Sequence, residues 1–335
     1  MSFLLQYVVF LAKLFTLVVA ILIVTAGVFS IARKAKEQNK NKLCVKKLNK
    51  KYQEFAETLN SEILNKKQLR KYAKEQKTKL KKTAKLVKKR VFVLNFQGDI
   101  KATAVNNLRE EITALIQVAT PQDEVVLRLE SGGGMVAPYG LAASQLQRLK
   151  DKRIPLTVTI DKIAASGGYL MACVGDKILA APFAIIGSIG VVAQLPNFHR
   201  FLKKRDIDFE LLTAGEYKRT LTIFGENTPK AREKTLQDLE EIHHLFKAFI
   251  QTNRKQVDMA EVATGAHWLA KDALALNLVD ELITSDDYLS LLAGSDKAEI
   301  YECQYLTKKS VTEKLSSNVQ SALSKLMWFK TSARS

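Results

Sequence analysis

Cysteine and histidine are scarce in this chain of 335 residues. Its three cysteines, Cys44, Cys173 and Cys303, lie far apart and form no Cys-x-x-Cys pair, which leaves no metal signature and allows at most one disulfide. Two of the four histidines, His243 and His244, are adjacent in an acidic helical stretch, a setting typical of a surface position or a weak metal site. We therefore expect no bound metal and no cofactor.

Acidic residues are scarce in one stretch of the chain, which explains its net charge of +18. Residues 32–90 hold 22 Lys and Arg against 5 Asp and Glu, whereas residues 91–335 hold 29 of each. The basic character therefore belongs to one segment, and the remainder is neutral. Neither interleaved aromatic residues nor a helix-turn-helix pattern accompanies the charge, so a nucleic-acid partner is not expected.

Residues 33–90 are predicted to form a basic helical stalk. Apolar side chains recur there at helical spacing and predict one amphipathic stripe, made by Leu48, Tyr52, Phe55, Leu59 and Ile63. One interpretation is a solvated stalk followed by a flexible linker. The other is attraction of the lysines to anionic lipid headgroups, worth ~1 kcal/mol per basic residue near the surface. The stripe also suits self-association.

One long apolar run, at residues 3–31, contains Lys13 as its only charge. Because about 20 apolar residues cross the core of a bilayer, residues 1–32 are predicted to form a transmembrane anchor. A cleaved signal peptide is the alternative, but the run is too long, no basic region precedes it and no small-residue cleavage site ends it. Basic residues follow at once, and the positive-inside rule would leave the rest of the chain in the cytoplasm.

From residue 91 onward, apolar runs of strand length alternate with helical patterns. Strands are expected at 91–96, 125–129 and 156–160, and helices at 105–118, 137–150 and 169–174. This alternation is typical of an α/β fold with a parallel β-α-β core, whose sites lie beyond the carboxyl ends of the strands. We assign residues 91–300 to this domain and residues 301–335 to a C-terminal tail.

Two glycine-rich turns follow predicted strands. Gly132, Gly133 and Gly134 remove every Cβ from the first turn, so that its backbone N–H groups can point into a cavity. Beside a serine hydroxyl, such donors would form an oxyanion hole. A phosphate-binding turn is the alternative, but the Lys-Ser/Thr ending of a P-loop is absent. The second turn, at 164–168, places Ser166 between small residues at a strand-to-helix junction.

Lys218 follows Ser166 by 52 positions, and a serine with a lysine base is a known variant of the nucleophile–base pair. Lysine ordinarily titrates near about 10.4, so this role requires a neutral amine, which an apolar cleft without a carboxylate would favour. Ser188, in a third small-residue turn, either orients Lys218 or only completes its turn. Taken alone, Lys218 would be an ordinary exposed lysine. No histidine is a convincing base among His199, His243, His244 and His267.

At these residues the chain resembles peptidase family S49, the signal peptide peptidase A group. The resemblance rests on motifs at 128–134, 140–148, 158–169, 187–190 and 217–219. It implies a ClpP/crotonase-like α/β fold with Ser166 as nucleophile and Lys218 as base. It also implies a homo-oligomeric ring or dome in which neighbouring protomers share active sites. The family setting is the bacterial inner membrane, with the catalytic domain on the periplasmic side.

The chain departs from this family at Gly132, where a proline commonly precedes the glycine pair. Gly133, Gly134 and Gly167 are the candidate backbone donors of the oxyanion hole. The expected activity is that of a serine endopeptidase that hydrolyses signal-peptide-like or misfolded polypeptides. Two alternatives remain, namely a membrane-anchored scaffold without catalysis and a crotonase-type acyl-CoA enzyme, which uses an oxyanion hole without a serine nucleophile.

Overall fold

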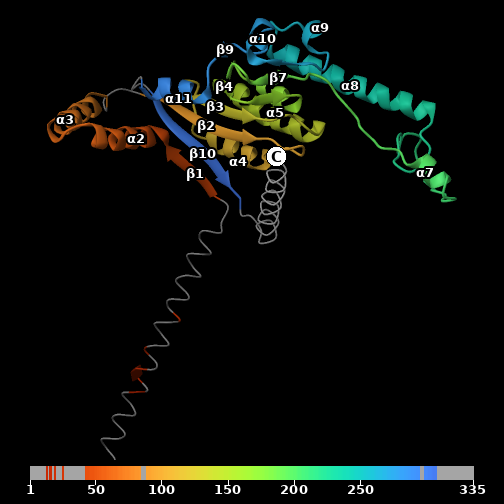
Figure 1. Ribbon diagram of the computed structural model, residues 1–335, viewed down its shortest axis with the longest axis horizontal. Coiled ribbons are helices and arrows are strands. Elements are labelled where there is room, and N and C mark those ends of the chain that lie inside the picture. The colour runs from red at the N-terminus through yellow and green to blue at the C-terminus, as the bar shows by residue number, and fades with distance from the viewer. Residues whose placement is uncertain are drawn as a thin grey trace, which may run out of the picture. The chain divides into compact units, whose positions relative to one another are not determined.

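The computed structural model describes residues 13, 15, 16, 19, 25, 42–83, 88–294 and 298–307 (Figure 1). The chain divides into two compact units, one of which comprises residues 44–304. The other comprises residues 1–43 and 305–335, and apart from isolated positions the predicted anchor at 1–32 lies outside the described residues, as does most of the predicted tail. Among the described residues, no helix is both long and apolar enough to cross a membrane.

A sheet with a parallel core forms the centre of the 44–304 unit. In the described part of the chain, its strands lie in the order β1, β10, β2, β3, β4, β6, β9, and every pairing from β10 to β9 is parallel. Their bounds are β1 (Lys42–Lys47), β2 (Lys89–Gln97), β3 (Glu124–Glu130), β4 (Leu156–Ile160), β6 (Lys177–Ala180), β9 (Glu281–Leu282) and β10 (Ala298–Leu306). The predicted α/β fold with a parallel β-α-β core is therefore confirmed.

Helices lie on both faces of this sheet and beyond its edge (Figure 1). They are α2 (Leu48–Ile63), α3 (Lys66–Thr83), α4 (Val105–Leu115), α5 (Val136–Asp151), α6 (Gly167–Ala172), α7 (His199–Lys203), α8 (Pro229–Asn253), α9 (Met259–Val262), α10 (Ala270–Ala275) and α11 (Ser285–Gly294). The helices predicted at 105–118, 137–150 and 169–174 correspond to α4, α5 and α6.

Successive side chains of β2 point to opposite faces of the sheet, and they pack into two separate hydrophobic cores, one on each face. Phe92, Leu94 and Phe96 belong to the larger core, which they share with buried residues of α4, α5 and α6. Val91 and Val93 belong to the smaller core, which α2 and α11 cover. The larger core is the one that supports the candidate site, because α5 and α6 both reach it.

A second, small sheet lies beyond the carboxyl ends of β3 and β4. It consists of β5 (Ile163–Ala165), β7 (Ile185–Gly187) and β8 (His267–Leu269), in that order. β5 and β7 are parallel, and β7 and β8 are antiparallel. A single bridge between Ser131 and Ala164 joins the end of β3 to β5. The two turns singled out in the sequence therefore emerge side by side.

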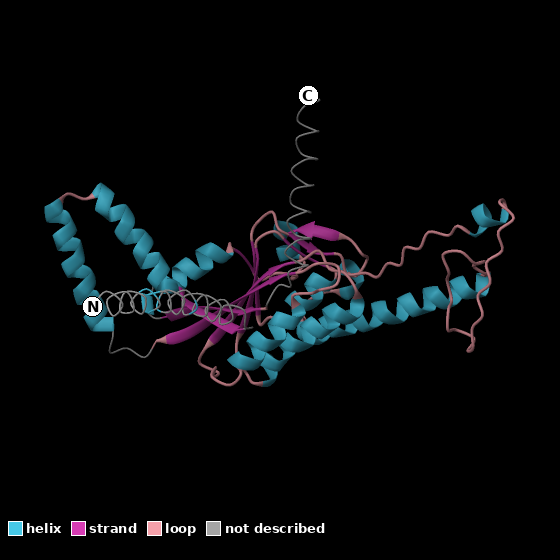
Figure 2. Ribbon diagram, turned by 90° about the horizontal axis from the view of Figure 1, so that it is seen from below, coloured by secondary structure: helices cyan, strands magenta, loops and turns pink. Residues whose placement is uncertain are grey.

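The helix α8 begins with Pro229 after the N-cap Thr228, whose hydroxyl accepts a hydrogen bond from the Ala231 N–H at 3.2 Å. Its C-terminal end buries Ile250 in the larger core. Figures 1 and 2 show the rest of α8 running away from the sheet toward α7. Residues 191–228, which connect β7 to α8, are mostly exposed.

The predicted basic stalk contains a strand as well as helices. The amphipathic helix is found as α2, where Leu48 is buried while Phe55, Leu59 and Ile63 remain exposed. The strand β1 precedes it and is not evident from its sequence, Lys-Leu-Cys-Val-Lys-Lys, because its partner β10 lies some 250 residues away. The compact unit consequently begins at Cys44, inside the stretch predicted as stalk.

Candidate active site

Ser166 stands at the junction of β5 and α6. Its backbone lies in the left-handed region, with φ 53° and ψ −120°, a conformation that costs a residue other than glycine ~1–3 kcal/mol. The Ser166 N–H donates to the Gly187 carbonyl of β7 at 2.8 Å, and β5 pairs with β7 in register up to that point. The small sheet thus holds a strained turn, and the serine side chain stays half-buried rather than enclosed.

The glycine turn at 132–134 lies directly against Ser166. Gly133 has a φ of 87°, and a Cβ built on it would lie 2.7 Å from both the Ser166 Cβ and the Gly167 nitrogen. Gly167 is equally confined, because a Cβ there would lie 2.5 Å from Cγ of Tyr139. Gly133 needs glycine for both its positive φ and the close approach, and Gly167 needs it for the close approach. The two turns therefore meet at Ser166.

The three candidate oxyanion donors differ in whether their N–H groups already donate a hydrogen bond within the protein. The Gly133 N–H donates to the Ser131 hydroxyl at 3.1 Å. In the described part of the chain, the N–H groups of Gly134 and Gly167 have no hydrogen-bond acceptor. Unoccupied N–H groups beside a serine hydroxyl can bind a developing oxyanion. Of the three, Gly134 and Gly167 are the donors that this geometry favours.

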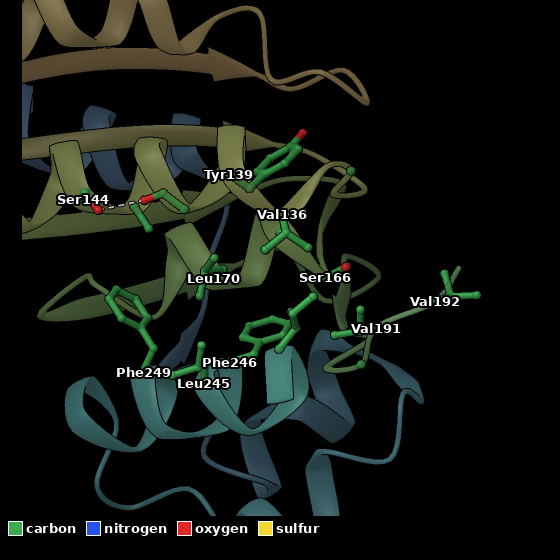
Figure 3. A pocket seen from close by; sticks show the side chains of 16 residues that line it. Val136, Tyr139, Ser144, Ser166, Leu170, Val191, Val192, Leu245, Phe246 and Phe249 are labelled. Atoms are coloured by element: carbon green, nitrogen blue, oxygen red, sulfur yellow. Dashed lines mark hydrogen bonds between the residues drawn. The ribbon is translucent and has the colours of Figure 1, made fainter. Parts of the chain in front are cut away.

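An apolar cavity of about 390 Å³ opens beside Ser166 (Figure 3). It lies between α5, α6 and the C-terminal half of α8. Figure 3 shows Ser166 near the end where Val191 and Val192 lie, with Phe249 at the other end. Its apolar lining includes Val136, Leu170, Ile242, Leu245, Phe246 and Phe249. A cavity of this size and lining suits an apolar side chain of an extended ligand.

A second cavity, of about 500 Å³ and more polar, also reaches Ser166. Ser188 lines it and has a φ of 51°, so the predicted orienting serine shares a cavity with Ser166. His243 and Glu240 line it as well, and the Nε2 atom of His243 is buried without a hydrogen-bond partner in the described part of the chain. The sequence left His243 either at a surface position or in a weak metal site, and only the position of α8 brings it to this cavity.

Lys218 lies outside both cavities and is exposed. The residues before Lys218 contact the N-terminal part of α8: Glu216 pairs with Lys230 at 2.5 Å, and the Tyr217 ring centre lies 5.8 Å from Lys234 Nζ. From residue 234 to residue 246, a helix rises by about 18 Å. The single chain therefore does not bring Lys218 to Ser166, and it does not supply the apolar cleft expected around that lysine.

Comparison with known proteins identifies the family. The model for the N-terminal part of peptidase family S49 matches residues 2–146, and the model for peptidase family S49 matches residues 148–299. "Probable protease SohB" from Haemophilus influenzae is 46% identical over 325 residues, covering 92% of this chain and 90% of that protein. The protein of the same name from Buchnera aphidicola subsp. Acyrthosiphon pisum is 52% identical over 240 residues, covering 72% of this chain and 71% of that one.

A solved structure, a mutant of the membrane-bound stomatin-specific protease 1510-N, covers 62% of this chain and 86% of its own, with 16% identity and a TM-score of 0.41. That likeness is too low to bear on the ClpP/crotonase-like fold, which stays a prediction. The two family models together match residues 2–146 and 148–299, and these two curated relatives are 46% and 52% identical to the chain. They show that the chain belongs to peptidase family S49.

Proposed function

We propose that the chain is a membrane-anchored serine endopeptidase with Ser166 as its nucleophile and Lys218 as its base. The observation that carries the proposal is the arrangement at Ser166. A strained turn presents its hydroxyl, the N–H groups of Gly134 and Gly167 lack acceptors among the residues that the structure describes, and an apolar cavity opens alongside. Membership of a peptidase family supports the same chemistry.

The proposed reaction proceeds by acyl transfer through Ser166. A neutral Lys218 Nζ takes the hydroxyl proton as Ser166 Oγ attacks the peptide carbonyl, and the N–H groups of Gly134 and Gly167 bind the oxyanion. The protonated amine then gives its proton to the leaving nitrogen, and the C–N bond breaks. A water molecule, deprotonated by the same amine, hydrolyses the acyl-enzyme and frees Ser166.

Lys218 is proposed to act on Ser166 of a neighbouring protomer in a homo-oligomeric ring. Within one chain it is exposed and lies outside the cavities that Ser166 lines. Its segment, residues 191–228, exposes an unusual number of large apolar side chains, among them Leu212 with 90% of its surface accessible, and also Val192, Phe201, Phe209 and Tyr217. Exposed large apolar side chains in this number are typical of a surface that contacts another protein. Association through this segment would also provide the apolar surroundings that a neutral lysine requires.

The proposed substrates are polypeptides with apolar side chains, such as signal peptides or misfolded membrane segments. Leu170, Phe246 and Phe249 give the cavity beside Ser166 an apolar wall. An apolar side chain of the substrate would be buried there, at a gain of ~1.5–3 kcal/mol for a residue such as leucine. No charged side chain lines that cavity in the described residues, so a charged residue at the cleaved bond would lack a partner.

The proposed anchor is the apolar run at residues 3–31, which would hold the protein in the bacterial inner membrane. The basic residues of 33–90 would then lie close to anionic lipid headgroups. We propose a periplasmic catalytic domain, following the family, although the positive-inside rule favours the cytoplasm. Added protease should digest residues 91–335 in spheroplasts without lysis. Digestion only after lysis would place the domain in the cytoplasm.

A fluorophosphonate probe tests the nucleophile directly. The purified full-length protein should be labelled, and Ser166→Ala should abolish both labelling and hydrolysis of an apolar fluorogenic peptide. Ser144→Ala is the matched control, because that serine also lines the apolar cavity beside Ser166, but its hydroxyl donates to the Gly140 carbonyl at 2.8 Å. Absence of labelling in the wild type would favour an inactive scaffold or an acyl-CoA enzyme.

Substitution of the candidate bases separates Lys218 from His243. Lys218→Met should lower kcat by ~10²–10⁴, the usual contribution of a positioned base, whereas Lys204→Met, which removes another exposed lysine of the same segment, should leave it unchanged. His243→Gln should retain most activity. If instead His243→Gln is inactive and Lys218→Met is active, the base is the histidine that lies in the cavity of the same chain.

A further inference from the structure

A continuous chain of hydrogen bonds runs from the glycine turn to the backbone that follows β2. The Gly133 N–H lies 3.1 Å from Ser131 Oγ, Ser131 Oγ lies 2.5 Å from Tyr139 Oη, and Tyr139 Oη lies 2.8 Å from the Asp99 carbonyl oxygen. Two of the four members are backbone groups and two are hydroxyls. The chain thus connects the end of β3, the first turns of α5 and the loop after β2.

The backbone groups at the two ends fix the direction of every bond. A backbone N–H only donates and a backbone carbonyl only accepts. The Tyr139 hydroxyl must therefore donate its one hydrogen to the Asp99 carbonyl, so the Ser131 hydroxyl must donate to Tyr139 Oη. Ser131 Oγ is then left as the acceptor for the Gly133 N–H. Neither of the two hydroxyls can rotate without breaking one of these hydrogen bonds, so the series has only one possible set of donors and acceptors.

Both hydroxyl-bearing residues are held rigidly. Ser131 is 2% exposed, and its backbone pairs with β5 through bonds of 2.9 Å to the Ile163 carbonyl and 3.0 Å from the Ala165 N–H. Tyr139 is fully buried. Its ring lies against Gly167, where a Cβ would come within 2.5 Å of the ring. Figure 3 shows the Tyr139 hydroxyl turned away from the apolar cavity, so it does not face a ligand there.

We propose that Tyr139 and Ser131 are positioning residues for the oxyanion hole, an inference that rests on the proposed peptidase activity. By accepting the Gly133 N–H, Ser131 fixes the orientation of the turn, so that the next N–H, that of Gly134, stays available to the substrate. The Tyr139 ring meanwhile packs on Gly167, the second donor. One buried tyrosine therefore sets both donors relative to Ser166.

Removing the tyrosine hydroxyl tests this proposal on the full-length protein. Tyr139→Phe should lower kcat for a fluorogenic peptide by roughly 10- to 100-fold, less than the ~10²–10³ of a donor lost outright, with KM changed by less than about twofold. Affinity for a peptide aldehyde, whose adduct carries an oxyanion, should fall by the same factor as kcat/KM. In the Ser131→Ala background, Tyr139→Phe should have little further effect, because both act through one bond chain.

Tyr169→Phe is the matched control. Tyr169 is also fully buried, and its hydroxyl donates to the Leu278 carbonyl at 2.9 Å, away from the glycine turn. It should lose comparable thermal stability while keeping its kcat. Equal kcat values for Tyr139→Phe and Tyr169→Phe, with an active wild type, would overturn the positioning role alone. A wild type that neither cleaves the peptide nor reacts with fluorophosphonate would instead overturn the proposed function.

Discussion

Ser166 and Lys218 are found in two regions of opposite character. Around Ser166, the backbone is paired on both sides, Tyr139 is fully buried, and glycines allow contacts that no other residue permits. Around Lys218, residues 191–228 expose large apolar side chains and contribute little to either core. A single chain thus preorganises the proposed nucleophile and the proposed oxyanion donors. The proposed base, by contrast, would depend on association with another copy.

Mixing inactive subunits gives the largest expected effect on this comparison. Ser166→Ala and Lys218→Met should each be nearly inactive alone, whereas assemblies that contain both should regain a measurable fraction of wild-type activity, because some interfaces join an intact serine to an intact lysine. Peptidase activity of co-assembled variants, with mixing verified by two affinity tags, measures this. Mixed assemblies without any recovery would assign both residues to one subunit.

Removing the anionic partner of the buried Arg254 should cost stability in the Ser166 region. Arg254 is 3% exposed, binds both carboxylate oxygens of Asp280 at 2.8 Å, and donates to the Asn277 carbonyl at 2.7 Å. Asp280→Ala should lower the free energy of unfolding by about 3–5 kcal/mol, because it leaves the buried Arg254 guanidinium without its anion. Chemical denaturation measures this. Lys218→Met should leave the unfolding midpoint unchanged, and an equal loss there would contradict the contrast between the two regions.

Acidic pH should lower the free energy of unfolding through protonation of Asp123, which is 4% exposed. Burial alone would raise the pKa of Asp123, but hydrogen bonds from Arg90 and Thr120 outweigh it and lower the pKa from 3.8 to about 2. A lowered folded-state pKa stabilises the fold above the unfolded value, and this stability disappears as the pH falls through the folded value.

The smallest predicted effect follows from that shift. Asp123→Asn should destabilise the protein by about 2 kcal/mol at neutral pH, and the difference from wild type should shrink between about pH 4 and pH 2. Unfolding free energies across that range measure it. A difference that stays constant with pH would mean that the Arg90–Asp123 pair does not contribute through its charge.

Several features of the site were predictable because their signals are local. The apolar runs of β2, β3 and β4 and the helical spacing of α4 and α5 lie within short windows of sequence. Ser166 among small residues and the glycines at 132–134 indicate tight turns for the same reason. The parallel order of the strands then places both turns at one edge of the sheet.

Other features depend on residues that lie far apart in the chain. The strand β1 forms because it pairs with the edge strand β10, which is distant in sequence. The apolar stripe of α2 is partly exposed, so helical periodicity does not predict how much of an apolar helix face other elements will bury. The sequence indicated a surface position or a weak metal site for His243, whereas α8 places it in the lining of the polar cavity.

The sequence by itself determined the α/β class, the serine turn, the glycine turn and membership of peptidase family S49, since all of these depend on neighbouring residues. Only the tertiary structure decided that the Gly133 N–H donates to the Ser131 hydroxyl, that Tyr139 packs on Gly167 and that Lys218 remains exposed. The physical reason is that hydrogen bonding and burial are satisfied by partners from other elements. Spacing along one segment does not specify those partners.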